Sequence, residues 1–289
     1  MTSDNGSTQF PEQQQTPPGR TDAMDPLPDH GEESYRGTGR LNGRRALITG
    51  GDSGIGRAVA IAYAREGADV AFTYLAEEQD DADQTKALVE AEGRTCLAMI
   101  ADLRERETCD RVIEETVAGL GGLDILVNNA GYQMARESSL AEMTDENIER
   151  TYRTNLFPIL WLARAAEPHL AAGSSIINNS SIQAFDPSVT LLDYASSKAA
   201  INNLTVNLAA QLGPKGVRVN AVAPGPIWTP LQPATQSPEK VAHLGEETPL
   251  GRAGQPAEVA PAFVFLASES DASYVSGTVL GVTGGKAVF

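Results

Sequence analysis

A tyrosine and a lysine four positions apart, Tyr194 and Lys198, form the pair in this sequence whose chemistry is easiest to name. On a helix this spacing brings both side chains to one face. A phenol with a pKa of about 10 is a poor acid or base at neutral pH, but a nearby ammonium favours the phenolate and lowers that pKa. The pair is therefore a candidate for proton transfer. A partly buried tyrosine beside a solvated lysine gives the same spacing, so the spacing alone does not establish a catalytic pair.

A cluster of glycines, Gly50, Gly54 and Gly56, lies between a short apolar run at 46–48 and a segment of helical composition. Strand, glycine turn and helix are the context that a dinucleotide fingerprint requires. Glycine lets the backbone approach a pyrophosphate because it has no Cβ, and the following helix offers unpaired N–H groups to the anion. The cluster predicts a nucleotide site, although a bare turn would also use these residues.

Small polar residues end several of the predicted strands. Ser180 and Ser181 follow an apolar run at 175–178, and Asp102 and Asn128 hold similar places after earlier runs. Ligands of open parallel sheets bind beyond the carboxyl ends of the strands. We therefore expect these side chains to gather at one edge of a sheet, although a serine pair alone can simply cap or turn the chain.

The elements that would position these residues alternate in type along the chain. Strands are predicted over 46–49, 69–74, 95–100, 123–127, 175–178, 217–222 and 278–282. Helices are predicted over 55–65, 77–92, 104–120, 190–212 and 256–267, with a further long helix from Thr144. This alternation predicts one doubly wound Rossmann-type α/β domain, a seven-stranded parallel sheet with helices on both faces.

The sequence divides into two parts. Residues 41–289 hold the predicted catalytic and dinucleotide-binding domain. Residues 1–40 are rich in Pro, Gln, Asp, Ser and Gly and cannot bury enough surface to fold alone. We expect this extension to be partly disordered, or to be an arm that docks on another surface, such as that of a neighbouring subunit.

Charge and composition exclude several classes of partner. The net charge of −16 argues against nucleic acid and anionic membranes, which both attract basic proteins. No apolar run approaches the roughly 20 residues of a membrane span, and no signal pattern opens the chain, so we expect a cytoplasmic protein. Its three scattered histidines show no metal-ligand pattern, and Cys96 and Cys109 are expected to be free thiols.

Taken in order, these features strongly resemble the short-chain dehydrogenase/reductase family. The matching residues are Thr49-Gly50-x-x-x-Gly54-x-Gly56, Asn128-Asn129-Ala130-Gly131, Asn155, Ser181, Tyr194-x-x-x-Lys198 and Pro224-Gly225, at intervals that also fit. The resemblance covers residue 41 to the C-terminus. The segment 34–41 and the glycine turn further resemble a bacterial subgroup with an N-terminal extension, described as aldehyde reductases or general oxidoreductases.

The resemblance implies a reaction and a role for each residue. The protein would transfer hydride between NAD(P) and a small neutral aldehyde, ketone or alcohol. Tyr194 would be the acid or base at the substrate oxygen, and Lys198 would hold the nicotinamide ribose and lower the tyrosine pKa. Ser181 would hydrogen-bond the substrate oxygen, while Asn155 would hold a water that relays protons.

The same resemblance implies the residues of the two binding sites. The cofactor site would comprise Gly50, Asp52, Ser53, Gly54, Ile55, Gly56, Tyr74, Asp102, Leu103, Asn129, Ala130, Gly131, Tyr194, Lys198, Pro224, Gly225, Ile227 and Thr229. The substrate site would comprise Ser181, Gln183, Phe185, Tyr194 and Trp228, and wider candidates for its wall are Gln133, Ala184, Ser188, Pro226 and Ile227. We expect the polar stretch 230–250, with one short helix, to form a mobile lid.

Two alternatives remain beside a carbonyl reductase. One is an enoyl (C=C) reductase of the same fold, whose members usually separate the tyrosine and lysine further. The other is a non-catalytic nucleotide-binding regulator, which would normally have lost one of the four catalytic residues present here. The family resemblance also implies a homotetramer.

The second predicted strand bears on cofactor choice. It ends at Thr73-Tyr74, with neither the acid typical of NAD sites nor an arginine for a 2′-phosphate. Acidic residues follow it, no basic residue stands between Arg65 and Lys86, and Arg57 lies where it can point to solvent. A 2′-phosphate would meet repulsion there. We predict that both cofactors are used, with NAD preferred.

Overall fold

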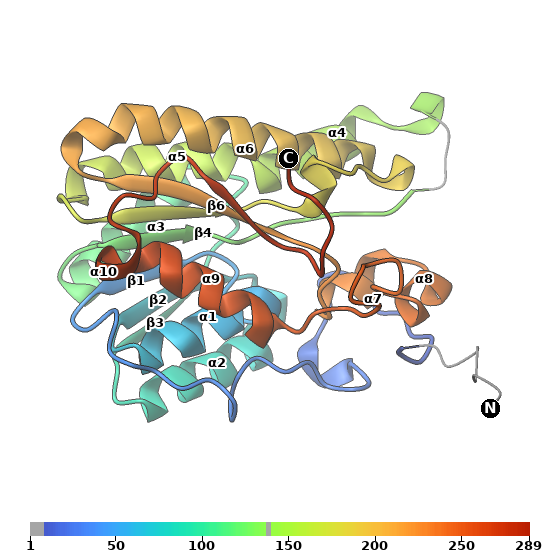
Figure 1. Cartoon of the computed structure of the whole chain (residues 1–289), viewed down its shortest axis with the longest axis horizontal. Coiled ribbons are helices and arrows are strands. Elements are labelled where there is room, and N and C mark those ends of the chain that lie inside the picture. Colours follow the sequence, from blue (N-terminus) through green and yellow to red (C-terminus); the bar gives the residue numbers. More distant parts are fainter. Residues whose placement is uncertain (1–8, 137–139) are drawn as a thin grey trace.

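A parallel sheet of seven strands lies at the centre of the structure (Figure 1). The structure is a computed structural model, and it describes residues 9–136 and 140–289. The strands are β1 (Arg45–Ile48), β2 (Asp69–Tyr74), β3 (Cys96–Ile100), β4 (Ile125–Asn128), β5 (Ser175–Asn179), β6 (Arg218–Pro224) and β7 (Val279–Val282). They pair in the order β3-β2-β1-β4-β5-β6-β7, and each pair is parallel. The predicted fold is confirmed.

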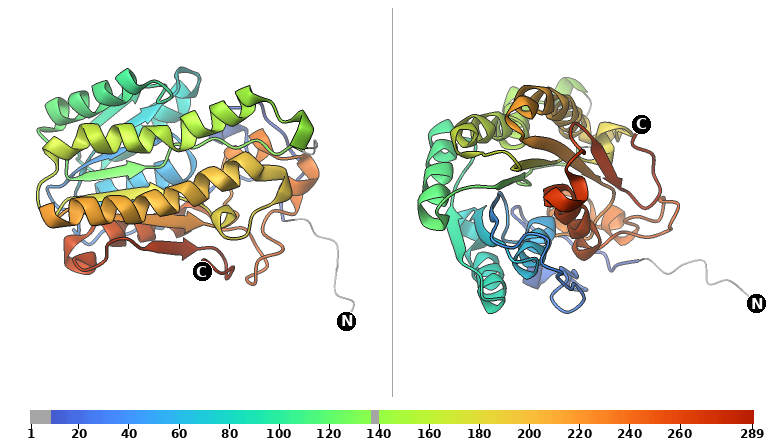
Figure 2. Two further views of the ribbon diagram at one scale, coloured as in Figure 1. Left: turned by 90° about the horizontal axis from the view of Figure 1, so that it is seen from above. Right: turned by 60° about the vertical axis from the view of Figure 1, so that its left-hand side comes forward.

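Helices cover both faces of this sheet (Figures 1 and 2). One face carries α1 (Gly54–Arg65), α2 (Gln79–Ala91) and α9 (Pro256–Ala267), and the other carries α3 (Arg106–Leu120), α4 (Asp145–Asn155), α5 (Phe157–Ala166) and α6 (Leu192–Leu212). A strand covered on both sides must be apolar on both sides. Hence Ala46, Leu47 and Ile48 of β1 are all fully buried, which explains why continuous apolar runs predicted the strands.

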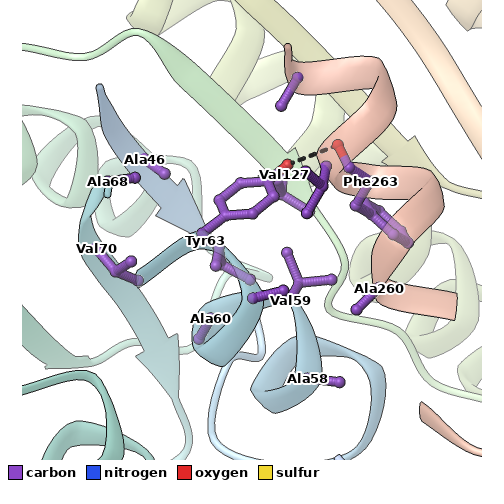
Figure 3. Packing of buried hydrophobic residues seen from close by; sticks show 14 of the residues in the cluster. Ala46, Ala58, Val59, Ala60, Tyr63, Ala68, Val70, Val127, Ala260 and Phe263 are labelled. Carbon is purple, nitrogen blue, oxygen red and sulfur yellow. Dashed lines mark hydrogen bonds between the residues drawn. The ribbon is translucent and has the colours of Figure 1, made fainter. Parts of the chain in front are cut away.

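The packing of α1 against α9 fixes the helix that begins at the glycine turn. Figure 3 shows Tyr63 of α1 in an apolar cluster, with its hydroxyl donating to the Phe263 carbonyl over 3.1 Å. Alanines at Ala58 and Ala60 present little bulk, so the sheet and its neighbours can approach α1 closely. The first turn of α1 is thereby held against the ends of the strands.

The predicted long helix from Thr144 is wrong in one respect, because the chain breaks between α4 and α5. The break follows Asn155 at Leu156, and Pro158 stands in the first turn of α5. Proline has no N–H to continue the hydrogen-bond ladder of a preceding helix. Asn155 consequently lies at a helix end, where its side chain reaches the loop after β4.

Two short helices, rather than the single one expected, occupy the stretch 230–250. They are α7 (Leu231–Thr235) and α8 (Pro238–Ala242), and both lie beyond the carboxyl ends of the strands (Figure 1). A further short helix, α10 (Glu269–Ala272), precedes β7. None of the helices within the described ranges is both long enough and apolar enough to cross a membrane.

The described part of the N-terminal extension, residues 9–40, runs along the outside of its own chain (Figure 1). Its end is fastened at Glu66, a buried carboxylate that accepts hydrogen bonds from the Tyr35 hydroxyl, the Thr38 amide and the Arg40 guanidinium. These partners offset the burial and lower the pKa of Glu66 to about 2. Residues 9–30 continue toward α7 and α8.

Candidate active site

A cavity of about 750 Å³ extends along the carboxyl ends of the strands. Its walls come from the turn after β1, the ends of β2 to β6, the segment with α7 and α8, and the N-terminal arm. The chain leaves β1 and β4 toward opposite faces of the sheet, which opens a crevice between them. The cavity therefore lies where doubly wound sheets bind their ligands.

The residues predicted for a cofactor site come together at this cavity, with one exception. Its walls include Gly50, Asp52, Ser53, Gly54, Ile55, Tyr74, Asp102, Leu103, Asn129, Ala130, Gly131, Tyr194, Lys198, Pro224, Gly225, Ile227 and Thr229. Gly56 is the exception, because it faces the preceding turn. A Cβ at Gly56 would lie 1.9 Å from the Gly50 carbonyl oxygen.

The glycine turn has the backbone that an anion site needs. Gly50 and Gly54 have φ angles of +61° and +50°, in the left-handed region that favours glycine. Gly51, which the sequence analysis missed, lies so near β2 that a Cβ would be 2.5 Å from the Phe72 Cβ. The first backbone bond of α1 runs from Arg57 N to Ser53 O, so the amides of its first turn, at 54–56, have no helical acceptor, whereas those of Gly50 and Gly51 donate to Thr73. This cradle fits a dinucleotide diphosphate.

Asn129 holds the loop after β4 against the loop after β1. Its Nδ2 donates to the carbonyl oxygens of Thr49 and Gly50, at 3.0 and 2.8 Å. The Thr49 hydroxyl accepts from the amides of Asn129 and Ala130, at 2.9 and 3.0 Å. Asn179 of β5 donates in turn to Asn129 Oδ1, over 2.9 Å. One amide side chain thus sets the spacing between three strand ends.

Tyr194 and Lys198 lie one turn apart on α6, with the lysine Nζ 5.5 Å from the centre of the tyrosine ring. Both are almost fully buried, and Lys198 Nζ donates to the Asn179 carbonyl over 2.6 Å. Ser181, directly after β5, also lines the cavity and hydrogen-bonds Tyr194. The two candidate proton-handling side chains and the serine hydroxyl therefore share one end of the cavity.

The predicted lowering of the tyrosine pKa is not what this arrangement gives. Burial raises the pKa of Tyr194 to about 12, and the hydrogen bond from Ser181 opposes that rise only in part. Burial also lowers the pKa of Lys198 to about 7, so a large fraction of this lysine is neutral at neutral pH. Lys198 is not among the groups that shift the pKa of Tyr194 in this arrangement.

Asn155 does not border the cavity directly. Its Oδ1 accepts from Tyr132 N over 2.7 Å, and its Nδ2 donates to the Tyr132 carbonyl and to Ser197 Oγ. A Cβ at Gly131 would make ordinary van der Waals contacts, 3.7 Å from Asn155 Oδ1 and 3.6 Å from Lys198 Nζ. A group the size of a methyl therefore fits beside Gly131, in contact with both the Asn155 amide and the Lys198 amine.

Two residues predicted for the substrate site lie elsewhere. Trp228 is fully buried, stacked on Phe10 at 3.8 Å between ring centres, and its Nε1 donates to the Pro26 carbonyl over 2.8 Å. Phe185 lies against a different surface hollow, because the helical turn Ile182–Ala184 carries the chain away from Ser181. Gln183 does line the cavity.

The other residues of the cavity wall include some of the wider candidates and some that were not predicted. Gln133, Ser188, Pro226 and Ile227 of the wider set do border the cavity, whereas Ala184 does not. The walls that the sequence analysis missed include Pro17, Pro18, Gly19, Leu75, Glu78, Leu231, Gln232, Thr235 and Gln236. Only Pro17, Pro18 and Gly19 approach through contacts distant in sequence, which no local pattern records; the others follow Tyr74 or Thr229 along the chain.

Carboxylates surround the end of the cavity near β2. Burial raises the pKa of Asp52 to about 6 and that of Glu78 to about 8; the charge of Asp81 adds to both rises, and that of Asp52 adds to the rise of Glu78. Arg57 does not point to solvent. It is buried and paired with Asp81 at 2.8 Å, and its Nε donates to the Asp52 carbonyl and to Thr85. The arginine nearest the turn is thus already satisfied.

The known proteins that this chain resembles are named as reductases, oxidoreductases or dehydrogenases. A family model described as enoyl-(acyl carrier protein) reductase matches residues 50–287. The uncharacterized oxidoreductase YhxD of Bacillus subtilis is 52% identical over 281 residues, which cover 96% of this chain and 93% of that protein. The chloroplastic NADPH-dependent aldehyde reductase 1 of Arabidopsis thaliana is 45% identical, covering 96% and 98%. A solved short-chain dehydrogenase from Burkholderia cenocepacia, in complex with NADP, superposes with a TM-score of 0.79 at 35% identity, covering 85% and 98%.

Proposed function

Since the chain belongs to the short-chain dehydrogenase/reductase family, we propose that it is an NAD(P)-dependent oxidoreductase acting on a small neutral aldehyde, ketone or alcohol. The observation that carries the proposal is the convergence of Tyr194, Lys198 and Ser181 on a cavity that a glycine cradle also lines. The cradle would hold the diphosphate. A bound nicotinamide supplies or accepts the hydride.

The chain's own residues would handle the proton. The Tyr194 hydroxyl would donate a proton to the carbonyl oxygen of the substrate, or take it back in the oxidative direction, while Ser181 hydrogen-bonds that oxygen. Lys198 would hold the ribose of the cofactor. The space at Gly131, between Asn155 and Lys198, is where we propose a water that relays protons to solvent.

The polarity of the walls supports a neutral substrate. Besides charged residues such as Lys240, Glu246 and Lys286, the cavity walls carry amide and hydroxyl side chains, among them Gln183, Ser188, Thr190, Gln232 and Gln236. Such groups exchange hydrogen bonds with hydroxyl or carbonyl oxygens and carry no charge. An aldehyde is also the substrate class named for the Arabidopsis thaliana relative. A hydroxylated or simple aldehyde is therefore our first candidate.

An enoyl reductase is the second candidate, because the matching family model bears that description. One substrate separates the two. With cinnamaldehyde and NADPH or NADH, a carbonyl reductase makes the unsaturated alcohol, whereas an enoyl reductase makes the saturated aldehyde. We expect the alcohol, identified by gas chromatography. The saturated aldehyde as main product would overturn the proposal in favour of the second candidate.

We further propose that both cofactors are used and that NAD is preferred. The support lies at the β2 end of the cavity, where the buried Asp52 is mostly ionised at neutral pH and the buried Arg57 is already paired with Asp81. Repulsion would weigh against a 2′-phosphate. The test compares kcat/KM for NADH and NADPH with one aldehyde. A preference for NADPH of about tenfold, or about 1.4 kcal/mol, would contradict it.

We also propose a homotetramer. The support is exposed apolar surface on two helices, with Leu160 of α5 and Val206 of α6 having 44% and 53% of their surfaces exposed. In addition, β7 is an edge strand of the sheet and presents unpaired backbone groups. Both features are typical of surfaces that a second subunit covers.

A further inference from the structure

The N-terminal arm borders the cavity at the end where the glycine turn lies. Pro17, Pro18 and Gly19 form part of the wall. Gly19 is buried against the residue that precedes α7, since a Cβ there would lie 2.4 Å from the Pro230 carbonyl oxygen. The preceding Thr229 in turn faces the glycine turn, 3.1 Å from a Cβ built on Gly54. The arm thus crosses beside the proposed diphosphate cradle.

On one side the arm is fastened to the segment with α7 and α8. Phe10 stacks on Trp228 with the rings 6° from parallel, and the pair forms a small apolar cluster with Met24, Val241 and Ala253. Backbone bonds reinforce this contact, from Gln9 N to Ala242 O at 3.0 Å and from Gln15 N to Pro233 O at 2.8 Å. Two of the five residues of this cluster belong to the arm, so the segment depends on the arm for its packing.

On the other side the arm is fastened to α2. Thr21 N donates to Asp81 Oδ2 at 3.0 Å, and Arg20 pairs with Asp80 at 3.1 Å. Asp81 also holds Arg57, whose Nε donates to the carbonyl of Asp52 in the glycine turn. A short series of hydrogen bonds therefore connects the arm to the turn that would bind the diphosphate.

We propose that residues 9–21 are a clasp that joins the α7–α8 segment to α2 over the proposed cofactor cradle, so that a pyridine dinucleotide exchanges only when the arm detaches. This inference rests on the proposed function, because it takes the ligand to be the dinucleotide. A bound dinucleotide and a docked arm must then stabilise each other, since coupling between two binding events is reciprocal.

The first test weakens the clasp outside the cavity wall. In Phe10→Ala the stacking on Trp228 is lost, and stopped-flow displacement of bound NADH should show a dissociation rate at least about fivefold faster. Leu27→Ala is the matched control, because this apolar arm residue has 65% of its surface exposed, and its rate should stay within about twofold of the parent's. Equal rates in all three proteins overturn the clasp.

A second variant acts on the wall itself. Gly19→Ala places a methyl group against Pro230 while leaving Phe10 and Trp228 intact, so it should also speed NADH release. Circular dichroism and the thermal midpoint establish that both variants are folded. If the parent protein binds neither NADH nor NADPH, the proposed function fails. If it binds them and neither variant changes the release rate, only the clasp fails.

The reverse coupling is tested on the unaltered protein. Trypsin can cut after Arg20, in the clasp, and after Arg36, an exposed arm residue outside it. Cleavage after Arg20 requires local detachment, so saturating NADH should slow it at least about tenfold. The rate after Arg36 should be unchanged. Identical rates after Arg20 with and without NADH contradict the proposal.

Discussion

Burial shifts the pKa values of Tyr194 and Lys198 in opposite directions. It raises the pKa of the Tyr194 phenol and lowers that of the Lys198 ammonium, because each loses the solvation of its charged form. At neutral pH the tyrosine therefore carries its proton, which suits a donor to a carbonyl oxygen. The lysine titrates inside the physiological range, and its charge becomes sensitive to what binds beside it.

Removing the phenol should abolish most of the proposed activity. In Tyr194→Phe the ring still fills its buried place, so the thermal midpoint and NADH affinity should stay near the parent values. We expect kcat/KM for an aldehyde to fall by roughly 10²–10⁴, the contribution of a positioned acid. Steady-state kinetics with a binding titration as control measures this. Turnover close to that of the parent would remove Tyr194 from its proposed role.

The titration of Lys198 should appear in the pH dependence of stability. Its pKa is about 7 when folded and 10.5 in the unfolded chain, so between these values the unfolded state holds more protons. This residue's contribution to the free energy of unfolding therefore rises with pH, by about 1.4 kcal/mol per pH unit within the window. Below pH 7 the penalty for burying the ammonium is constant.

Lys198→Met lacks this titration and provides the comparison. Denaturant unfolding of both proteins, without cofactor, from pH 6.5 to 9.5 should show the parent gaining stability relative to the variant as pH rises. This range stays below the window in which Tyr194 titrates. A stability difference that does not change with pH would mean that the lysine keeps its charge in the folded protein.

At the scale of elements, the glycine turn is built on approaches that no side chain allows. A Cβ on Gly56 would lie 1.9 Å from the Gly50 carbonyl oxygen, and one on Gly51 would lie 2.5 Å from the Phe72 Cβ. The helix start is consequently held at a fixed distance from β1 and β2. This arrangement is sensitive to a single added carbon.

Gly56→Ala should therefore destabilise the protein by about 2 kcal/mol or more and impair NADH binding, because the methyl would meet the Gly50 carbonyl at 1.9 Å. Gly213→Ala is the control. It has no atom within 4 Å of the new methyl and a φ of −52°, so its stability should stay within about 0.5 kcal/mol of the parent's. Denaturant unfolding measures the change in stability, and calorimetric titration measures NADH binding. Tight NADH binding by Gly56→Ala would refute the close approach.

Elements were predictable from the sequence where their burial is regular. The run 69–74 coincides with β2, because a strand covered on both faces must be apolar throughout. The break at Leu156 has a sequence signal in Pro158, which the prediction of one long helix from Thr144 did not take into account. Trp228 was misassigned for a different reason. Its partner Phe10 lies more than two hundred residues away, and no local spacing reports such a contact.

At the scale of the whole molecule, the surface beside α6 and β7 is the part best suited to another subunit. Val206 lines a hollow of about 500 Å³ together with Phe185, Val279 and Val288, next to the unpaired edge of β7. Among the residues that the structure describes, the lining of this hollow carries no charged side chain, and Asn202, Asn203 and Thr278 form its polar part. Association there would also cover the sheet edge.

Static light scattering in native buffer should accordingly give a mass about four times that of the 30.5 kDa chain. Val206→Asp places a charge in the hollow and should shift the population toward smaller species. Ser196→Asp, on the same helix but lining no part of the hollow, is the control and should keep the parent mass. A monomer in the parent protein would contradict the assembly, whatever the variants do.

The stacking of Phe10 on Trp228 also gives the protein an intrinsic tryptophan fluorescence that reports on the arm. The chain has two tryptophans, of which Trp228 is fully buried and Trp161 only partly so. An indole released from a dry, stacked site into water emits at longer wavelength. With Trp161 replaced by phenylalanine, the emission maximum of the remaining indole would follow the docking of residues 9–30 in real time, without an added label and without any turnover.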